Sequence, residues 1–287
     1  MTSACSGPRS GGPRSSSPAA RLAPTAAPAQ PTPPGASSTA SRVSSSTTST
    51  TEAVAADPRA LAVQVARTET AIRDLATPGS VLAGLGRTEM LAYRQLATHP
   101  AWVAPVLAQT PPGLRAAVAA NVDAAVELAA LVPPATKAPS WEVRPPAPAD
   151  QLLGYYREAE AASGVPWYYL AAVHLVETGM GRIRSPSTAG AQGPMQIMAD
   201  EWAAHGQGDI HSDHDAILAA GRILRAYGAP DMAKALYRYN PSRHYVRAVT
   251  DYAEVMHADE RAYRGYYNWP VLVRLVTGDV VLPEAPS

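Results

Sequence analysis

The sequence predicts a mainly α-helical protein that ends in a short β-hairpin. In several segments, apolar residues recur at spacings of three and four, which is the period of a helix face packed on a core. Capping residues, prolines and glycines stand at the ends of these segments, where helices start and stop. Near the C-terminus, the apolar runs Val271 to Val276 and Val280 to Leu282 flank Thr277-Gly278-Asp279, as in a hairpin.

Composition excludes several classes of protein. The chain has 287 residues, of which 46% are hydrophobic and 17% charged, with a formal net charge of zero. That apolar fraction can fill a sizeable core, whereas zero net charge argues against a nucleic-acid partner. No apolar run approaches the roughly 18 residues of a membrane-spanning helix. The single cysteine, Cys5, excludes an internal disulfide framework and a cysteine-based metal site.

Changes in composition divide the chain into five segments. The first, 1–56, consists mostly of Ser, Thr, Pro, Ala and Gly and cannot bury enough apolar area to offset its chain entropy. We therefore predict a disordered tether there. The other segments are a helical domain (57–132), a proline-rich linker (133–149), the domain that carries the chemistry (150–262) and a C-terminal extension with the hairpin (263–287).

The helical domain begins at Asp57-Pro58, a cap followed by proline at the first helical position. We expect its first helix to end at Pro78-Gly79, a second helix over Val81 to Leu96, and a third over Leu114 to Ala129. It contains no cluster of titratable groups, so its role is predicted to be structural.

In the next domain, Asp150 is expected to cap a helix that Gly164 closes. The following helix, from Pro166 to Gly179, reads PWYYLAAVHLVETG and places Glu177 in its last turn, on an apolar face. Burial and the negative end of the helix dipole both disfavour ionisation, so the pKa of Glu177 is expected to be raised. A neutral carboxyl can act as a general acid. The alternative is an ion pair with Arg182 or Arg184.

Two further segments carry polar groups. SPSTAGAQGPMQIM, from Ser185 to Met198, exposes backbone amides at its glycines and places the amide of Gln196 between apolar residues, which suits a sugar-binding cleft. In ALYRYNPS, Pro241 is expected to end a helix at Tyr239-Asn240, which presents a phenol and an amide at its C-terminus.

Together with DIHSDHDAILAAGRIL, these segments resemble the lytic transglycosylases of bacterial cell walls, in the lysozyme-like superfamily. The resemblance covers residues 150–259 and implies a lysozyme-like catalytic domain. It implies that Glu177 is the catalytic acid/base and that Ser187 and Gln196 bind around the N-acetylmuramic acid ring. It also implies that Tyr239 and Asn240 close the cleft opposite Glu177.

Other features resemble the MltB-like branch, especially secreted actinobacterial forms. These are the helical region 57–132 and the closing segment YRGYYNWPVLVRLVTGDVVLP. The branch carries GPMQF where this chain has Ile197, a departure that leaves the acid intact and alters the cleft wall.

The resemblance implies cleavage of the β-1,4 bond between N-acetylmuramic acid and N-acetylglucosamine, with formation of 1,6-anhydromuramic ends and without a cofactor. No Asp or Glu lies between Glu177 and Asp200, which fits a single-acid route. Two alternatives stay open: a hydrolytic muramidase and a non-catalytic peptidoglycan-binding protein. We expect an extracytoplasmic monomer whose partner is the peptidoglycan glycan strand.

Histidines raise a competing possibility. His205, His211 and His214 lie among carboxylates, and imidazole together with carboxylate can bind a divalent metal. However, Ser212 and Asp213 stand where a helix cap belongs, and no HExxH-type pattern is present, so we predict no metal. His174 is expected to be a packed histidine.

Small residues before Cys5 and a tether after it look like a lipoprotein cleavage site that lacks its hydrophobic signal. Two interpretations stay open: a lipid anchor at Cys5, with the true start upstream, or a cysteine without a role.

Overall fold

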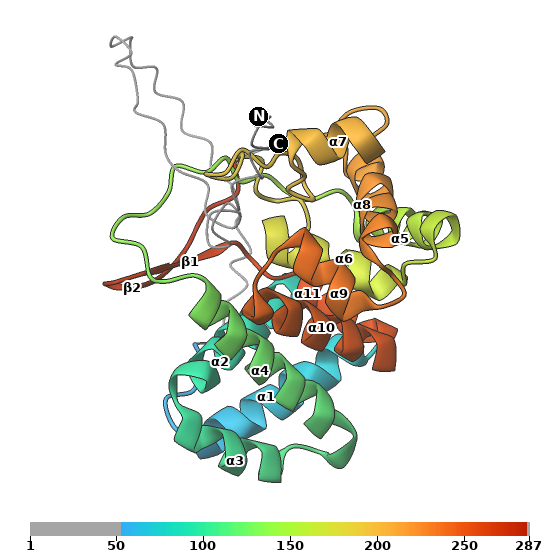
Figure 1. Ribbon diagram of the computed structural model, residues 1–287. Coiled ribbons are helices and arrows are strands. Elements are labelled where there is room, and N and C mark those ends of the chain that lie inside the picture. Colours follow the sequence, from blue (N-terminus) through green and yellow to red (C-terminus); the bar gives the residue numbers. More distant parts are fainter. Residues whose placement is uncertain (1–52, 286–287) are drawn as a thin grey trace, which may run out of the picture.

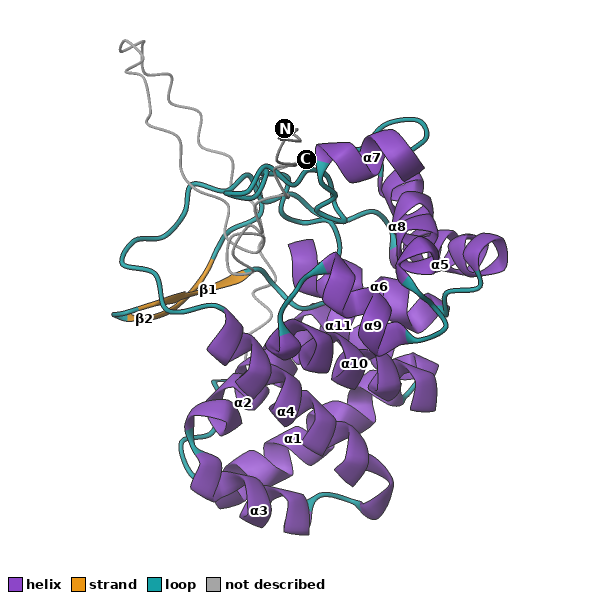
Figure 2. Ribbon diagram, in the orientation of Figure 1, coloured by secondary structure: helices purple, strands orange, loops and turns teal. Residues whose placement is uncertain are grey.

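The computed structural model describes residues 53–285, and these are mainly helical, as the sequence predicts (Figures 1 and 2). Cys5 and the predicted tether as far as residue 52 lie outside the described residues. The elements are α1 (Pro58–Arg73), α2 (Gly79–Thr98), α3 (Pro100–Gln109), η2 (Pro112–Leu114), α4 (Arg115–Leu131), α5 (Ala149–Ser163), α6 (Trp167–Thr178), α7 (Ala199–His205), α8 (Asp213–Tyr227), α9 (Met232–Tyr239), α10 (Arg243–Ala258), η3 (Glu260–Ala262), α11 (Tyr263–Tyr267), β1 (Leu272–Leu275) and β2 (Gly278–Val281).

Helix α1 starts as expected and ends early. The Asp57 carboxylate caps it by accepting hydrogen bonds from the backbone N–H groups of the first turn. The helix ends at Arg73 rather than at Pro78-Gly79. Its end is set by Asp74, whose side chain accepts a hydrogen bond from the N–H of Ala76 (2.9 Å) and so favours a turn over another helical residue.

Three helices, α3, α7 and α11, were not predicted, and α5 starts one residue before its predicted cap. Helix α3 contains Pro100 at its start and Pro105 inside, and these prolines interrupt the pattern that marks a helix in the sequence. Pro148 occupies the cap position of α5. Asp150 therefore lies in the first turn of α5. Its negative charge there interacts favourably with the positive end of the helix dipole, but its side chain does not cap the helix.

Helix α10 lies at the centre of the molecule. It packs against α4 on one side and against α6 and α9 on the other. Helices α1 to α4 form the lower part of Figure 1, α5, α7 and α8 lie at the upper right, and α6 and α9 lie near the middle. One continuous cluster of buried side chains runs through both parts, and α6 is buried on nearly all sides. The two predicted helical units therefore share a core, and their division into domains stays a prediction.

The hairpin forms where it is expected, with a shifted turn. Strands β1 and β2 are antiparallel, and Leu275 pairs with Gly278, so that Val276-Thr277 makes the turn instead of Thr277-Gly278-Asp279. The proline-rich segment 133–149 packs against both the hairpin and the loop after α6, through bridges of Ala135 with Leu275 and of Val143 with Ile183.

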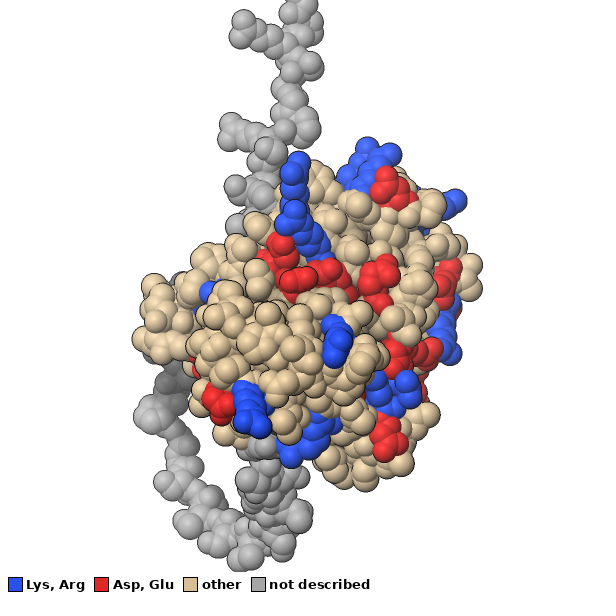
Figure 3. All heavy atoms as spheres, turned by 90° about the horizontal axis from the view of Figure 1, so that it is seen from below, with Lys and Arg blue, Asp and Glu red and all other residues tan. Residues whose placement is uncertain are grey.

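Among residues 53–285, no helix is both long and apolar enough to cross a membrane. On the face shown in Figure 3, acidic and basic side chains lie next to one another rather than forming fields of one sign. This arrangement agrees with the zero net charge of the whole chain.

Candidate active site

Glu177 lies in the last turn of α6, and the helix ends directly after it. Gly179 adopts the left-handed conformation (φ 64°), and the N–H of Met180 returns to the carbonyl of His174 (3.1 Å), which closes the helix end. Glu177 is 7% exposed, and its Oε2 atom is buried. The hydroxyl of Tyr245, on α10, donates a hydrogen bond to Oε1 (2.8 Å). The chain therefore holds a buried carboxyl at the end of its most buried helix.

The two arginines that follow Glu177 bind other carboxylates. Arg182 Nε lies 2.8 Å from Glu284 Oε1, and Arg184 Nη2 lies 3.2 Å from Asp213 Oδ2. These two ion pairs differ from the alternative expected from the sequence, in which Arg182 or Arg184 pairs with Glu177.

The GPMQIM segment folds into a tight hairpin. The backbone groups of Gln192 and Ile197 exchange two hydrogen bonds of 2.9 Å. Between them, Gln196 adopts a left-handed φ of 49°, which is uncommon for a residue with a side chain. Its amide donates to the carbonyl of Gly193 (2.9 Å). Only glycine fits at position 193, because a Cβ there would lie 1.9 Å from the carbonyl oxygen of Ile210.

Ser187 closes a separate turn just before this hairpin. Its hydroxyl accepts a hydrogen bond from the N–H of Ala191 (3.0 Å), and the residue is 6% exposed. The resemblance assigns Ser187 to sugar binding; in this structure its hydroxyl holds the loop.

Two hydroxyls bind this hairpin through its backbone. Thr178, the neighbour of Glu177, donates to the carbonyl of Pro194 (2.6 Å), and Tyr239 donates to the carbonyl of Met195 (2.6 Å). Tyr239 is the last residue of α9, as predicted. The structure thus connects Glu177, the Gln196 loop and the end of α9.

Asn240 follows Tyr239 and is completely buried. Neither its Oδ1 nor its Nδ2 has a hydrogen-bond partner among the described residues. A buried amide without partners is unfavourable by about 1–3 kcal/mol, so this side chain has unused capacity to bind a polar group.

A small pocket adjoins these residues. It is lined by Gln196, Ile197, Met198, Glu201, Ile223, Tyr227 and Tyr239. The hydroxyl of Tyr227 donates a hydrogen bond to Glu201 within it. The pocket therefore combines apolar walls with one amide, two phenols and one carboxylate.

Tyr245 is the residue that the sequence did not assign to the site. Five tyrosines recur in the sequence at near-helical spacing, which predicts core positions for most of them: Tyr237, Tyr239, Tyr245, Tyr252 and Tyr263. Tyr245 is indeed completely buried. No motif marks its contact with Glu177, because the two lie 68 residues apart in sequence.

His174 is a packed histidine, as expected. Its Nδ1 lies 2.7 Å from the hydroxyl of Tyr156. Burial, together with the nearby Arg184, lowers the pKa of His174 to about 3, so the ring is neutral. Its Nε2 faces Asp213 Oδ1 at 3.7 Å.

The histidine-rich segment forms local contacts. Ser212 caps α8, as predicted, and His214 lies 3.0 Å from both Asp215 and Glu158. Within the part of the chain that the structure describes, no three His, Cys, Asp or Glu residues gather into a metal-binding group.

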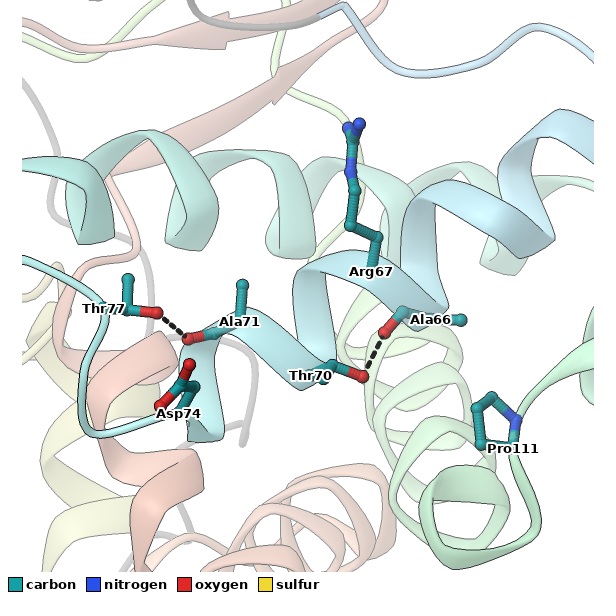
Figure 4. Close-up of a pocket in the computed structure, with 7 residues that line it drawn as sticks. All are labelled: Ala66, Arg67, Thr70, Ala71, Asp74, Thr77 and Pro111. Atoms are coloured by element: carbon teal, nitrogen blue, oxygen red, sulfur yellow. Dashed lines mark hydrogen bonds between the residues drawn. The ribbon is translucent and has the colours of Figure 1, made fainter.

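A wider groove, of about 480 Å³, lies away from Glu177, along α1. Asp74 and Thr77 lie at one end of it and Pro111 at the other (Figure 4). The Thr70 and Thr77 hydroxyls are occupied by backbone carbonyls of α1. The groove therefore presents little free hydrogen-bonding capacity, and we assign it no chemistry.

Comparisons of the chain with models of known protein families, with curated proteins and with solved structures find no match.

Proposed function

We propose that this protein is a peptidoglycan lytic transglycosylase with a lysozyme-like catalytic domain, acting outside the cytoplasm on glycan strands. The proposal combines the sequence resemblance with one central observation. Glu177 places a carboxyl at the end of a buried helix, hydrogen-bonded by Tyr245 and joined through Thr178 to the loop that carries Gln196. Helices α6 and α10 fix this carboxyl in position, as acid/base catalysis requires.

In the proposed reaction, Glu177 donates its proton to the glycosidic oxygen, and the bond from that oxygen to C1 of N-acetylmuramic acid breaks. The carbonyl oxygen of the substrate's own N-acetyl group bonds to C1 and bears the positive charge. The Glu177 carboxylate then takes the proton of the C6 hydroxyl, whose oxygen attacks C1 and displaces the acetamido oxygen. The product is a 1,6-anhydromuramic end, and no water is consumed. The steps after protonation are implied by the family resemblance.

The two carboxyl oxygens of Glu177 have different surroundings. Oε2 is buried, whereas Oε1 accepts the hydrogen bond from Tyr245. In the proposed reaction, the carboxyl must donate a proton and then recover one. Because only 7% of Glu177 is exposed, the proposed reaction also requires a movement that brings the substrate to this carboxyl.

Neutral groups are proposed to bind the sugar. Asn240 carries a buried amide whose donor and acceptor are both unused, so a hydroxyl or acetamido group of the substrate is a suitable partner. Gln196 and Tyr239 line the adjoining pocket. Together they would bind an uncharged ring without adding charge near Glu177.

Hydrolysis with water is the second candidate. Glu201 lies in the same pocket as Gln196 and Tyr239, and a carboxylate there could position a water for attack at C1. Mass analysis of muropeptides separates the candidates: anhydro ends indicate transglycosylation, reducing ends indicate hydrolysis, and no cleavage indicates a binding protein. Glu201→Gln should abolish only the hydrolytic reaction.

The decisive variant is Glu177→Gln, because the amide cannot donate and recover a proton. We expect the melting temperature to change little and the clearance of cell-wall suspensions to fall by about 10²–10⁴-fold. Glu254→Gln, at a half-exposed position on α10, is the matched control and should clear walls normally. Residual activity of Glu177→Gln above about a tenth of wild type would refute the assignment.

A further inference from the structure

Arg182 is a buried arginine that connects three separate segments. It is 6% exposed, and its Nη1 donates to the carbonyl of Gly179 (3.0 Å), the residue that ends α6. Its Nη2 donates to the carbonyl of Tyr267 (2.8 Å) in α11, and its guanidinium lies over the ring of the same tyrosine (5.5 Å). Its Nε donates to Glu284 (2.8 Å), near the C-terminus. The planar guanidinium allows all these contacts at once, which a lysine could not provide.

The segment 282–285 is attached along its length. The N–H of Leu282 donates to the carbonyl of Val271 (2.9 Å), and the N–H of Ala285 donates to the carbonyl of Val143 (2.8 Å). Leu282 also packs on a small apolar cluster that is separate from the main core, formed by Val143, Ile183 and Val271. The backbone of the segment is therefore fixed by Val271 and Val143, and its side chains Leu282 and Glu284 contact the loop that follows Glu177.

That loop pairs through its backbone with the proline-rich segment. The N–H of Arg144 donates to the carbonyl of Arg182 (2.9 Å), and the N–H of Arg184 donates to the carbonyl of Glu142 (3.0 Å). The proline-rich segment is thus bonded both to the loop and, through Val143, to segment 282–285, whose Glu284 side chain also reaches the loop at Arg182.

We propose that residues 282–285 form a strap that fixes the end of α6, with the Arg182–Glu284 ion pair as its closing contact. Arg182 and Glu284 are then positioning residues for Glu177, which lies two residues before Gly179. This inference rests on the proposed function, because it assigns the strap to the placement of the catalytic acid. A small displacement of a catalytic group lowers kcat strongly. It changes KM little, because other residues of the site bind the substrate.

Glu284→Gln tests the strap, because it removes the charge of a side chain that is 39% exposed and so perturbs folding little. The matched control is Glu260→Gln, which breaks the Arg157–Glu260 pair of 2.6 Å between exposed side chains. For Glu284→Gln we expect kcat for wall cleavage to fall about tenfold with KM within twofold, and amide hydrogen exchange over residues 180–184 to become about tenfold faster. Glu260→Gln should change neither, and the conservative variant Glu284→Asp should recover most of kcat.

Two results would overturn the proposal. Exchange over 180–184 that stays at the wild-type rate in Glu284→Gln would show that the tail does not restrain the loop. Faster exchange with an unchanged kcat would show that the loop does not position Glu177. A wild-type protein that releases no muropeptides would refute the proposed function instead, and the exchange measurement would still decide whether the strap exists.

Discussion

The carboxyl groups of Glu69 and Glu89 lie together in the core where α1 and α2 meet α11, so the helical region does contain a cluster of titratable groups, contrary to the expectation from the sequence. These two groups make stability depend on pH. Glu69 pairs with Arg73 and accepts a hydrogen bond from the hydroxyl of Tyr93. Glu89 accepts a hydrogen bond from Trp269 Nε1 (2.7 Å) and shares one with Glu69. Burial raises the pKa of Glu89 well above its usual 4.5, and the negative charge of Glu69 raises it further. Glu89 is therefore protonated in the folded protein at pH values where the unfolded chain has lost that proton.

This difference fixes the sign of the pH dependence. Because the folded state binds more protons than the unfolded state above pH 4.5, the free energy of unfolding falls as the pH rises toward the folded pKa of Glu89. Between pH 4.5 and the folded pKa of Glu89, the slope is at most about 1.4 kcal/mol per pH unit for one proton. The contribution is fully present below pH 4.5.

The variant Glu89→Gln has no proton to lose at this position, and its amide can donate to Glu69 as the protonated carboxyl does. We expect its stability relative to wild type to rise with pH between pH 4.5 and the folded pKa of Glu89, by up to about 1.4 kcal/mol per pH unit. Urea unfolding of both proteins at pH 5, 6 and 7 measures this, with Glu254→Gln as a control at an exposed position. Parallel pH profiles for wild type and Glu89→Gln would refute the shared-proton interpretation.

Three further variants address the site. Tyr245→Phe removes the hydroxyl that donates to Glu177. We expect wall cleavage to fall and the free energy of unfolding, measured with denaturant, to drop by about 1–3 kcal/mol. The control Tyr252→Phe, on the same helix, should leave cleavage intact. Gly193→Ala should lower the melting temperature sharply, since its Cβ would meet a backbone oxygen at 1.9 Å and its φ is 70°; an unchanged melting temperature would contradict the loop geometry. Gln196→Gly relieves about 1 kcal/mol of left-handed strain, so stability should hold while wall cleavage falls. If cleavage instead persists in Gln196→Gly, the amide does not bind substrate.

The sequence predicted well those features that depend on a few neighbouring residues. Asp57 and Ser212 cap helices because their side chains accept hydrogen bonds from N–H groups two or three residues away. Gly164 and Gly179 end helices because each adopts a left-handed conformation that disfavours other residues. Local chemistry of this kind can be read without knowledge of the rest of the chain.

Contacts between distant segments could not be read in this way. Glu177 and Tyr245 are 68 residues apart, and Arg182 and Glu284 are 102 apart. Each pair is brought together by packing of the main chain around α10 and α11. No local sequence pattern at either residue predicts the contact. The sequence therefore indicated the candidate acid and missed the residues that contact it.

The candidate site is also positioned largely through backbone acceptors. Thr178 and Tyr239 hold the Gln196 loop by donating to the carbonyls of Pro194 and Met195, which any residue could supply. The side chains of the loop are consequently not needed for its attachment to α6 and α9. Gln196 keeps a left-handed conformation that costs stability, although glycine would adopt it more easily. The Gln196 amide offsets part of that cost by donating to the carbonyl of Gly193, and in the proposed enzyme the same side chain also contacts the sugar.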